Sequence, residues 1–245
     1  LGLNVVAGWN KPEYDAFGID LPGDHSDRYA MAQEWFDYVQ KLWTADTAFD
    51  WDGNFYQGKG VYSLPHPVQP KMPIINAAGS EEGRVFAMRN ADFLFTPVFD
   101  FDQAKATAAD ITERAASVGR KVDVLTLCTV VCRPTQQEAD DYLNWYSEEQ
   151  ADWEAVDNLM TLQGMHAQSF TPEALALYRD RMAAGHGGFP LVGTPDTIAD
   201  LLEKLSVAGI AGTTLAFVDY AKEFPYFRQE VLPRLEAKGL RQPVN

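Results

Sequence analysis

The chain has 245 residues, of which 46% are hydrophobic and 22% are charged, which is typical of a globular protein with a sizeable core. Its formal net charge of −15 argues against nucleic acids and anionic membranes as partners, because both attract clusters of Lys and Arg. The sequence contains no apolar run of about 18 residues, the length that a membrane-spanning helix needs, so we expect a cytoplasmic protein.

Predicted strands and helices alternate along the chain. Short apolar runs rich in β-branched residues predict buried strands, and apolar residues at helical spacing predict the helices between them. The expected strands are 3–9, 73–78, 91–96, 122–132 and 212–217. The expected helices are 27–44, 81–90, 101–118, 135–153, 194–208 and 224–238.

Two segments depart from this alternation. Residues 46–70 are rich in aromatic residues, Gly and Pro, and predict an excursion with a small hairpin. Residues 154–190 predict a helical insertion that contains no strand and ends in a Gly-rich stretch. This Gly-rich stretch is a candidate lid over an active site.

Strand–helix units of this buried, parallel type predict an α/β fold in a single domain, 1–245. A closed (β/α)₈ TIM barrel has eight such units. The five predicted here lead us to expect the C-terminal portion of a barrel that lacks the first roughly three βα units. An open doubly wound sheet is the structural alternative.

The two cysteines give no sign of a disulfide. Cys128 and Cys132 lie four residues apart on one predicted strand, which separates them by roughly 13 Å. That distance is too long for a disulfide bond. We therefore expect buried thiols in a reducing compartment.

A Gly-Ser pair follows the second predicted strand and opens the next helix. Gly79 lets an anion approach the backbone, Ser80 offers a hydroxyl, and the free N–H groups at a helix start attract phosphate. Glu81 and Glu82 weaken this signal because they already occupy the positive end of the helix. Ser80 acting as an ordinary helix N-cap is the plainer interpretation.

Four polar side chains surround the end of the first predicted strand. Asn4 lies within the strand, and Glu13 lies in the loop beyond it. Arg28 and Tyr29 begin the next helix. These types suit a flavin, whose ring edge needs hydrogen-bond partners and whose phosphate needs Arg, Tyr and backbone N–H groups. A surface ion pair of Glu13 with Arg28 and a core position for Tyr29 are the alternatives.

Several motifs together resemble one enzyme family. Those at the predicted flavin site are Asn4-Val5-Val6-Ala7-Gly8-Trp9 with Glu13-Tyr14, Arg28-Tyr29 and Gly79-Ser80. Those nearer the end are Gly187–Pro195 and Val218-Asp219-Tyr220. They resemble the bacterial luciferase-like flavin monooxygenases, within the group that contains the alkanesulfonate, dimethyl sulfone and pyrimidine monooxygenases. The resemblance covers nearly the whole chain.

The resemblance implies a two-component monooxygenase with a TIM-barrel fold. Such enzymes bind FMN at the C-terminal mouth of the barrel and accept it in reduced form from a separate NAD(P)H-dependent flavin reductase. With O₂ they oxygenate a small organic substrate, here expected to be a heterocyclic or organosulfur compound. The resemblance also implies a homo-oligomer. The flavin-contacting positions that it implies are Asn4, Glu13, Arg28, Tyr29, Gly79 and Ser80.

The sequence departs from this group at three positions. Ala7 stands where the group has Thr, which removes one hydroxyl near the flavin. Thr129 and Ala184 stand where the alkanesulfonate enzymes carry a His and an Arg. These two differences argue against an alkanesulfonate substrate. No residue of this chain is assigned as the catalytic proton donor.

The histidines have no zinc-like spacing, so no metal site is predicted. They are His25, His66, His166 and His186. His186, in the Gly-rich stretch, is a candidate contact to the substrate or the flavin phosphate, and an exposed His in a hinge is the plainer interpretation. Trp9 is a candidate for an apolar substrate pocket. Trp51, Phe55 and Tyr56 are expected to pack the excursion against the barrel.

Two other functions fit the same sequence. One is hydride transfer by a deazaflavin-dependent enzyme of the same superfamily. The other is flavin binding without catalysis. Preference for reduced deazaflavin over reduced FMN, with turnover that needs no oxygen, distinguishes the first of these from the monooxygenase.

Overall fold

A computed structural model describes residues 1–21, 23, 25–77, 79–164 and 171–243. The chain divides into two compact units. Unit 1 comprises Leu1–Phe95 and Glu113–Val122, and unit 2 comprises Thr96–Thr112 and Asp123–Asn245. Helix α4 (Phe101–Ser117) contributes to both units, and each unit is described by itself.

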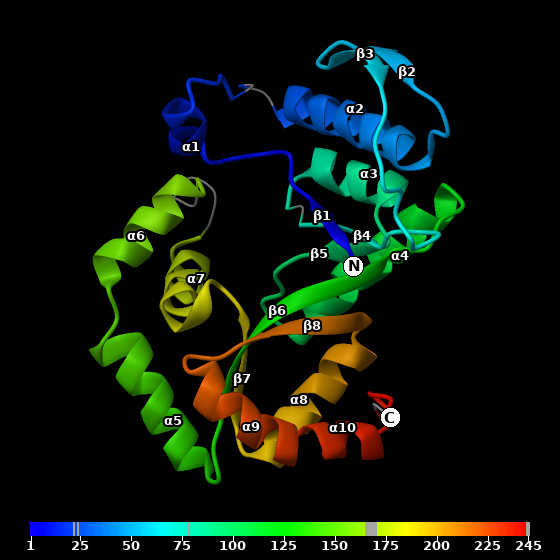
Figure 1. The fold of residues 1–245 in the computed structure, drawn as a ribbon. Helices are drawn as coiled ribbons and strands as arrows, with labels where there is room; N and C mark the ends of the chain where they lie inside the picture. Colours follow the sequence, from blue (N-terminus) through cyan, green and yellow to red (C-terminus); the bar gives the residue numbers. More distant parts are fainter. Residues whose placement is uncertain (22, 24, 78, 165–170, 244–245) are drawn as a thin grey trace. The chain divides into compact units, whose positions relative to one another are not determined.

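Unit 1 contains a parallel sheet whose middle strand is β4 (Figure 1). Its strands are β1 (Leu3–Val5), β4 (Ile74–Asn76) and β5 (Phe93–Phe95). Its helices are α1 (Lys11–Ala16), α2 (His25–Thr44) and α3 (Glu81–Asn90). Because parallel strands share one carboxyl edge, the loops after β1 and β4 leave the sheet on the same side.

The core of unit 1 lies between this sheet and helices α2 and α3. Phe36 of α2 and Leu94 of β5 are fully buried, and Phe86 of α3 is 3% exposed. The rings of Phe36 and Phe86 meet edge to face, with their centroids 6.0 Å apart. At the far end of α3, the amides of Gln33 and Asn90 bond to each other and tie α3 to α2.

A two-stranded antiparallel hairpin, β2 (Phe49–Asp52) and β3 (Gln57–Val61), is anchored to α2 by one carboxylate. Glu34 accepts hydrogen bonds from the Trp51 indole at 3.3 Å and from the backbone N–H groups of residues 54–56. Gly53 is required beside it, because a Cβ there would collide with the Glu34 carboxylate. The hairpin therefore depends on a carboxylate that belongs to another element.

In unit 2 the long strand β6 (Asp123–Cys132) lies between two parallel partner strands (Figure 1). Strand β7 (Phe189–Gly193) pairs with the second half of β6, and β8 (Ile210–Ala216) pairs with its first half. The other helices of the unit are α5 (Gln136–Asn144), a π-helical turn (Trp145–Glu149), α6 (Trp153–Leu162), α7 (Pro172–Gly185), α8 (Pro195–Val207), α9 (Tyr220–Glu230) and α10 (Leu232–Ala237).

The predicted alternation of strands and helices is confirmed, with local corrections. The helix predicted over 81–90 has those bounds, and each of the five predicted strands is found. Strand 3–9 is shorter than predicted and ends at Val5, before Gly8 with its positive φ of 87°. Strand 73–78 ends at Asn76, and Ala78 lies outside the described residues.

Four further corrections have physical causes. Strand β7 was not predicted, because Pro190 and the preceding glycines look like a loop; Pro190 is tolerated within this short strand. Helix α1 was read as a loop because Pro12 is an N-terminal signal that is easily mistaken for a turn. The helix predicted over 135–153 ends in the π-helical turn before Asp152 caps α6, and the helix predicted over 224–238 breaks at Val231.

Both cysteines are free and buried, as predicted. Burial raises the pKa of the Cys128 thiol to about 12 and that of the Cys132 thiol to about 11. The thiols are therefore protonated at neutral pH and behave as small core side chains. Among the described residues, no helix is long and apolar enough to cross a membrane.

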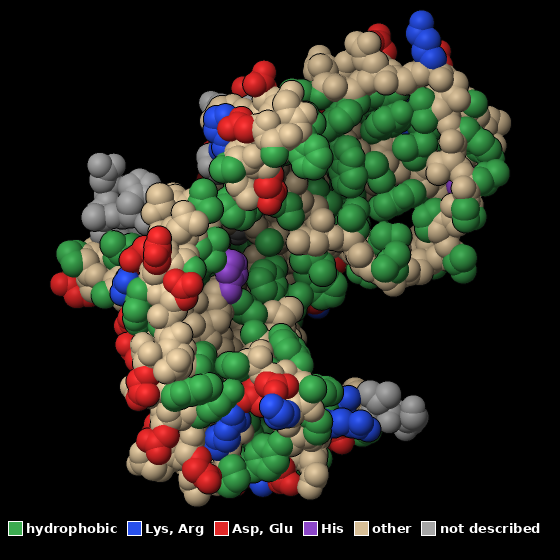
Figure 2. Space-filling model, turned by 60° about the vertical axis from the view of Figure 1, so that its left-hand side comes forward, with side chains coloured by type: hydrophobic (Ala, Val, Ile, Leu, Met, Phe, Trp, Pro, Cys, Tyr) green, Lys and Arg blue, Asp and Glu red, His purple; other side chains and the backbone are tan. Residues whose placement is uncertain are grey.

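Acidic side chains are spread over the visible surface, in keeping with the net charge of −15 (Figure 2). The same view shows hydrophobic side chains gathered on one face of unit 1. A groove on unit 1 beside β1 is lined by Val5, Val6, Met31, Trp35 and Tyr56, among others.

Candidate functional site

The candidate site of unit 1 lies at the carboxyl end of β4, where α3 begins. Ser80 is the N-cap of α3, and its hydroxyl accepts a hydrogen bond from the backbone N–H of Gly83 at 3.2 Å. Ser80 is therefore an ordinary helix N-cap in its local structure, which confirms the plainer interpretation. A Cβ placed on Gly79 would have no heavy atom within 4 Å, so the space beside the helix start is open.

Tyr29 of α2 is brought to the same place. Burial raises the pKa of its phenol, while the nearby Asn76 and Ser80 side chains lower it and the Glu82 carboxylate raises it again. The ring also packs on Phe86, with a centroid distance of 5.9 Å. The structure thus places two predicted residues, Tyr29 and Ser80, beside each other.

Asn76 ends strand β4 and was not among the predicted site residues. Its side chain is 1% exposed, and its Nδ2 donates to the Val5 carbonyl at 2.7 Å. Its Oδ1 is buried without a hydrogen-bond partner among the described residues. The signal for this residue was present in the sequence, since an Asn closes the apolar run Ile74-Ile75 at the carboxyl end of a strand.

Arg28 is also buried, with 9% of its surface exposed. It donates to the carbonyl of Gly8 at 3.2 Å, which connects the start of α2 to the loop after β1. Gly8 adopts a positive φ of 87°, and a Cβ there would collide with the Tyr14 hydroxyl. The Gly of the opening motif is therefore required by backbone conformation and by space.

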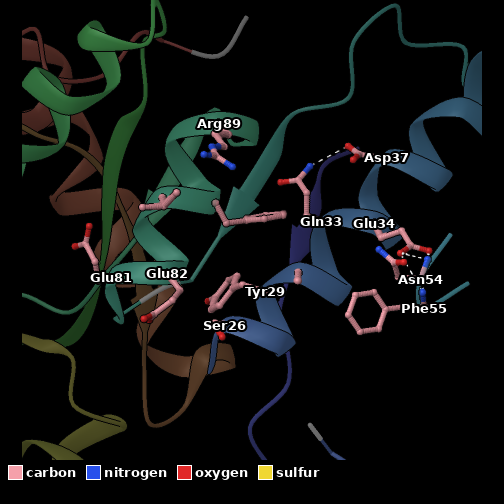
Figure 3. A pocket seen from close by; sticks show the side chains of 13 residues that line it. Ser26, Tyr29, Gln33, Glu34, Asp37, Asn54, Phe55, Glu81, Glu82 and Arg89 are labelled. Carbon is pink, nitrogen blue, oxygen red and sulfur yellow. Dashed lines mark hydrogen bonds between the residues drawn. The ribbon is translucent and has the colours of Figure 1, made fainter. Parts of the chain in front are cut away.

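A groove of about 600 Å³ runs beside this site between α2 and α3. Figure 3 shows Tyr29 on the α2 wall and Glu82 on the α3 wall near the start of the two helices. The far part of the groove is bounded by the hairpin turn, where Glu34 holds the backbone of Asn54 and Phe55 (Figure 3).

The remaining predicted contacts of unit 1 do not join this cluster. Asn4 is exposed on β1 and lines the separate groove beside that strand. Glu13 is exposed on the first turn of α1, and Trp9 is 45% exposed. Among the described residues, no hydrogen bond, ion pair or ring contact links these three side chains to Tyr29 or Ser80, so their roles stay predictions.

In unit 2, the Gly-rich stretch forms the end of helix α7. His186 has a positive φ of 54° and is exposed, and its backbone N–H bonds to the Met182 carbonyl at 3.2 Å. The Gly187 N–H bonds to the Arg181 carbonyl at 3.0 Å. This is a left-handed helix cap, in which the His is a strained exception to the usual Gly. Its function as a lid or substrate contact stays a prediction.

The two positions that distinguish this chain from the alkanesulfonate enzymes meet at this cap. The Thr129 hydroxyl donates to the Gly185 carbonyl at 3.3 Å, and the Tyr146 hydroxyl donates to the Ala184 carbonyl at 2.9 Å. A Cβ on Gly185 would come within 2.6 Å of the Thr129 hydroxyl. His166 and the rest of 165–170 in the predicted insertion lie outside the described residues. No group of three or more metal ligands occurs within the described ranges.

Comparison with known proteins shows relatives along the whole chain. Residues 1–212 match the family described as luciferase-like monooxygenase. The chain is 30% identical, over 241 residues, to an FMNH₂-dependent dimethylsulfone monooxygenase of Pseudomonas putida. That match covers 95% of this chain and 65% of the relative. It is 31% identical, over 246 residues, to the pyrimidine monooxygenase RutA of Yersinia enterocolitica, covering 97% of this chain and 66% of RutA.

The fold is shared with solved structures. The structure of the long-chain alkane monooxygenase LadA matches with a TM-score of 0.81 at 24% identity, over 99% of this chain and 64% of LadA. The prediction of an α/β fold of the TIM-barrel type, rather than an open doubly wound sheet, is confirmed by this likeness. The chain spans slightly less than two thirds of the length of LadA and of the dimethylsulfone monooxygenase.

Proposed function

We propose, from the premise that this chain belongs to the luciferase-like monooxygenase family, that it acts in a two-component FMN-dependent monooxygenase. In this proposal a separate NAD(P)H-dependent reductase supplies reduced FMN, and O₂ is used to oxygenate a small organic substrate. The relatives named for dimethylsulfone and pyrimidine monooxygenation favour an organosulfur or heterocyclic substrate.

The observation that carries the proposal is the convergence of Tyr29 and Ser80 at the start of α3. A phosphate is bound by hydroxyl donors, by free N–H groups at a helix start and by nearby Arg. All three kinds of group lie in unit 1, and the space beside Gly79 is open. Asn76 adds a buried oxygen without a partner at the same strand end. The residues present therefore fit the phosphate end of FMN.

The work of this chain would be binding and orientation. Reduced FMN, when bound, supplies the electrons that activate O₂. Tyr29, Gly79 and Ser80 would hold the phosphate, while Arg28 would fix the loop after β1 through the Gly8 carbonyl. Asn4 and Glu13 are proposed contacts to the flavin, and Trp9 and His186 are proposed contacts to the substrate. The described apolar side chains around β1 would exclude water from the site.

The assembly is part of the proposal. The two units would form one domain of the TIM-barrel type, with the flavin site at the carboxyl ends of its strands. We also propose a homo-oligomer in the cytoplasm, where buried free thiols such as Cys128 and Cys132 remain reduced. Hydride transfer with a deazaflavin is the alternative chemistry, and the relative named FMNH₂-dependent supports FMN over it.

The test is anaerobic titration of the protein with reduced FMN and, separately, with a reduced deazaflavin, followed by mixing with oxygenated buffer and candidate substrates. We expect saturable binding of reduced FMN and an oxygenated product whose added oxygen atom comes from ¹⁸O₂. Tighter binding of the deazaflavin, with substrate conversion in the absence of O₂, would overturn the proposal in favour of hydride transfer. Flavin binding without conversion of any substrate would favour a binding protein.

A further inference from the structure

We infer, resting on the proposed function, that the Gly-rich cap of α7 is a rigid support that presents the His186 imidazole to an oxygen of the substrate. Thr129 and Tyr146 are the positioning residues that hold this support in place. All of these residues belong to unit 2.

His186 occupies a position that glycine would fill with less strain. Its φ of 54° is left-handed, and a residue with a Cβ is strained in that conformation. Glycine stands on both sides of it, as Gly185 and Gly187, so a side chain is retained at this one position of the cap. Backbone strain of this kind is concentrated where a side chain has a function.

The His186 imidazole is exposed and makes no contact that would offset the strain. Within the part of the chain that the structure describes, no hydrogen bond, ion pair or ring contact engages it. A neutral imidazole has one N–H donor and one acceptor nitrogen. It can therefore donate to a neutral oxygen acceptor, such as a sulfone oxygen or the carbonyl of a heterocycle.

The cap is held firmly although it is rich in glycine. The last carbonyls of a helix lack partners within the helix itself. Here the Met182 carbonyl accepts the His186 N–H at 3.2 Å, and the Arg181 carbonyl accepts the Gly187 N–H at 3.0 Å. These two bonds fix the backbone on both sides of the His186 side chain.

The carbonyls of the two residues before His186 are held by hydroxyls from other elements. Tyr146 donates to the Ala184 carbonyl at 2.9 Å, and Thr129 donates to the Gly185 carbonyl at 3.3 Å. Thr129 is 5% exposed, so its bond is shielded from water. Burial raises the pKa of the Tyr146 phenol, which therefore keeps its proton and can donate.

Close packing on Thr129 accounts for two of the glycines. A Cβ on Gly185 or on Gly188 would come within 2.6 Å of the Thr129 hydroxyl oxygen. These glycines are therefore required by space, and their presence does not indicate a flexible segment. A stretch with paired carbonyls and close contacts to a buried strand residue is a fixed support and not a hinge.

Thr129 also places the cap near the carboxyl ends of strands. The pairing of β6 with β8 ends at Thr129 and Ala216, and Ala216 is the last residue of β8. In parallel α/β folds, ligands bind beyond the carboxyl ends of the strands. The support thus carries His186 at the edge of unit 2 where a substrate is expected.

Hydrogen exchange at the Gly187 amide tests the support itself. Thr129→Val keeps the shape of the side chain but removes the hydroxyl, and we expect about tenfold faster exchange. Tyr146→Phe should act in the same direction, and Thr129→Ser, which keeps the hydroxyl, should retain slow exchange. Thr112→Val is the matched control, because it removes a hydroxyl bonded only to its own helix at the Ala108 carbonyl. Unchanged exchange in Thr129→Val would overturn the inference.

Two substitutions of His186 separate strain from substrate binding. We expect His186→Gly to raise the urea midpoint of unfolding, because the strain is relieved. His186→Ala keeps the strain and should not raise it. Both should increase the KM for the substrate by about fivefold and leave the KM for reduced FMN unchanged, because both lose the imidazole. The substrate is whichever of dimethyl sulfone and uracil the wild-type protein converts.

A double-mutant cycle tests whether Thr129 acts through His186. Thr129→Val alone should raise the substrate KM by about threefold. In the His186→Ala background it should cause little further change, because the ring that it positions is already gone. Fully additive increases would overturn the positioning role of Thr129.

These outcomes distinguish the role of His186 from the function on which it rests. Wild-type protein that converts neither substrate with reduced FMN and O₂ contradicts the proposed function, while the exchange at Gly187 still decides whether the cap is a rigid support. Conversion by the wild-type protein that is impaired in neither His186 variant contradicts only the role of His186.

Discussion

In unit 2 a carboxylate and a guanidinium at the strand ends satisfy each other, whereas in unit 1 one buried amide oxygen at a strand end has no partner among the described residues. In unit 2, Glu223 is 9% exposed and bonds to Arg133 at 2.5 Å and to the backbone N–H of Asp219 at 3.1 Å. The Arg133 guanidinium also donates to the Cys132 carbonyl and lies over the Tyr142 ring at 4.0 Å. In unit 1, the Asn76 oxygen has no partner among the described residues.

This difference distinguishes a buried polar network that stabilises the fold from a polar cluster that can bind a ligand. A network in which every group is satisfied contributes to stability and leaves nothing for a ligand. A cluster with an open acceptor, an available hydroxyl and a helix start is incomplete until something binds. We therefore expect substitutions in the Arg133–Glu223 network to change stability, and substitutions around Ser80 to change ligand affinity.

The largest expected effect is on stability. Glu223→Ala leaves the partly buried Arg133 guanidinium without its carboxylate and should lower the free energy of unfolding by about 3 kcal/mol. The control is Asp196→Ala, which breaks an exposed ion pair with Arg234 and should cost less than about 1 kcal/mol. Urea unfolding of both variants measures the difference. Similar small losses in both would contradict the structural role of the network.

The second effect is on affinity. Ser80→Ala and Arg28→Ala should each weaken binding of FMN by roughly 1–3 kcal/mol, the value of a lost hydrogen bond to an anion or of a lost contact that orders the site. Ser117→Ala, which removes a hydroxyl bonded only to its own helix on α4, is the control and should have no effect. Isothermal titration with FMN gives the three affinities. Unchanged affinity in both site variants would remove the phosphate assignment.

The third effect depends on pH and concerns the hairpin. Burial raises the pKa of Glu34, but the N–H donors of the hairpin outweigh it, so the pKa lies below its ordinary value of 4.5. A lowered pKa means that the carboxylate stabilises the fold above pH 4.5 and that this contribution is lost as the pH falls through the lowered value. Glu34→Gln should therefore be less stable than wild type at neutral pH, and the gap should narrow in acid. A gap that does not depend on pH would contradict this account.

The smallest expected effect comes from Glu82. This exposed carboxylate lies in the first turn of α3, where it disfavours the Tyr29 phenolate and would repel a phosphate bound there. Glu82→Gln should tighten FMN binding by about threefold at low salt, and less at high salt because the charges are then screened. Riboflavin affinity should stay the same. Weaker FMN binding in this variant would indicate that the phosphate lies elsewhere.

The sequence predicted the helices and strands of unit 1 better than it predicted which of their side chains lie beside each other. The apolar spacing of 27–44 and 81–90 was sufficient to find α2 and α3, because long amphipathic helices carry a strong periodic signal. The meeting of Tyr29 with Ser80 depends on how α2 and α3 pack on one sheet, which the spacing does not contain. Asn76 was missed although it closes an apolar strand, because that position alone does not show whether its side chain is buried beside a site.

In unit 2, by contrast, one of the strands themselves could not be predicted from the sequence. Strand β7 follows two glycines and contains Pro190, so its composition is that of a loop, and only pairing with Cys128–Cys132 makes it a strand. The Gly-rich stretch around His186 was predicted as a candidate lid or a hinge, and its anchoring by Thr129 and Tyr146 depends on residues far away in the sequence. Tertiary contacts decided both features.

The central claim is that the start of α3 receives the phosphate of FMN. The most direct measurement is a crystal structure of the protein grown with FMN. The account predicts the phosphate beside Gly79, within hydrogen-bond distance of the Ser80 hydroxyl or the Tyr29 phenol, with Asn76 still on the Val5 carbonyl. A phosphate bound away from α3, with Tyr29 and Ser80 facing only protein or water, would contradict it.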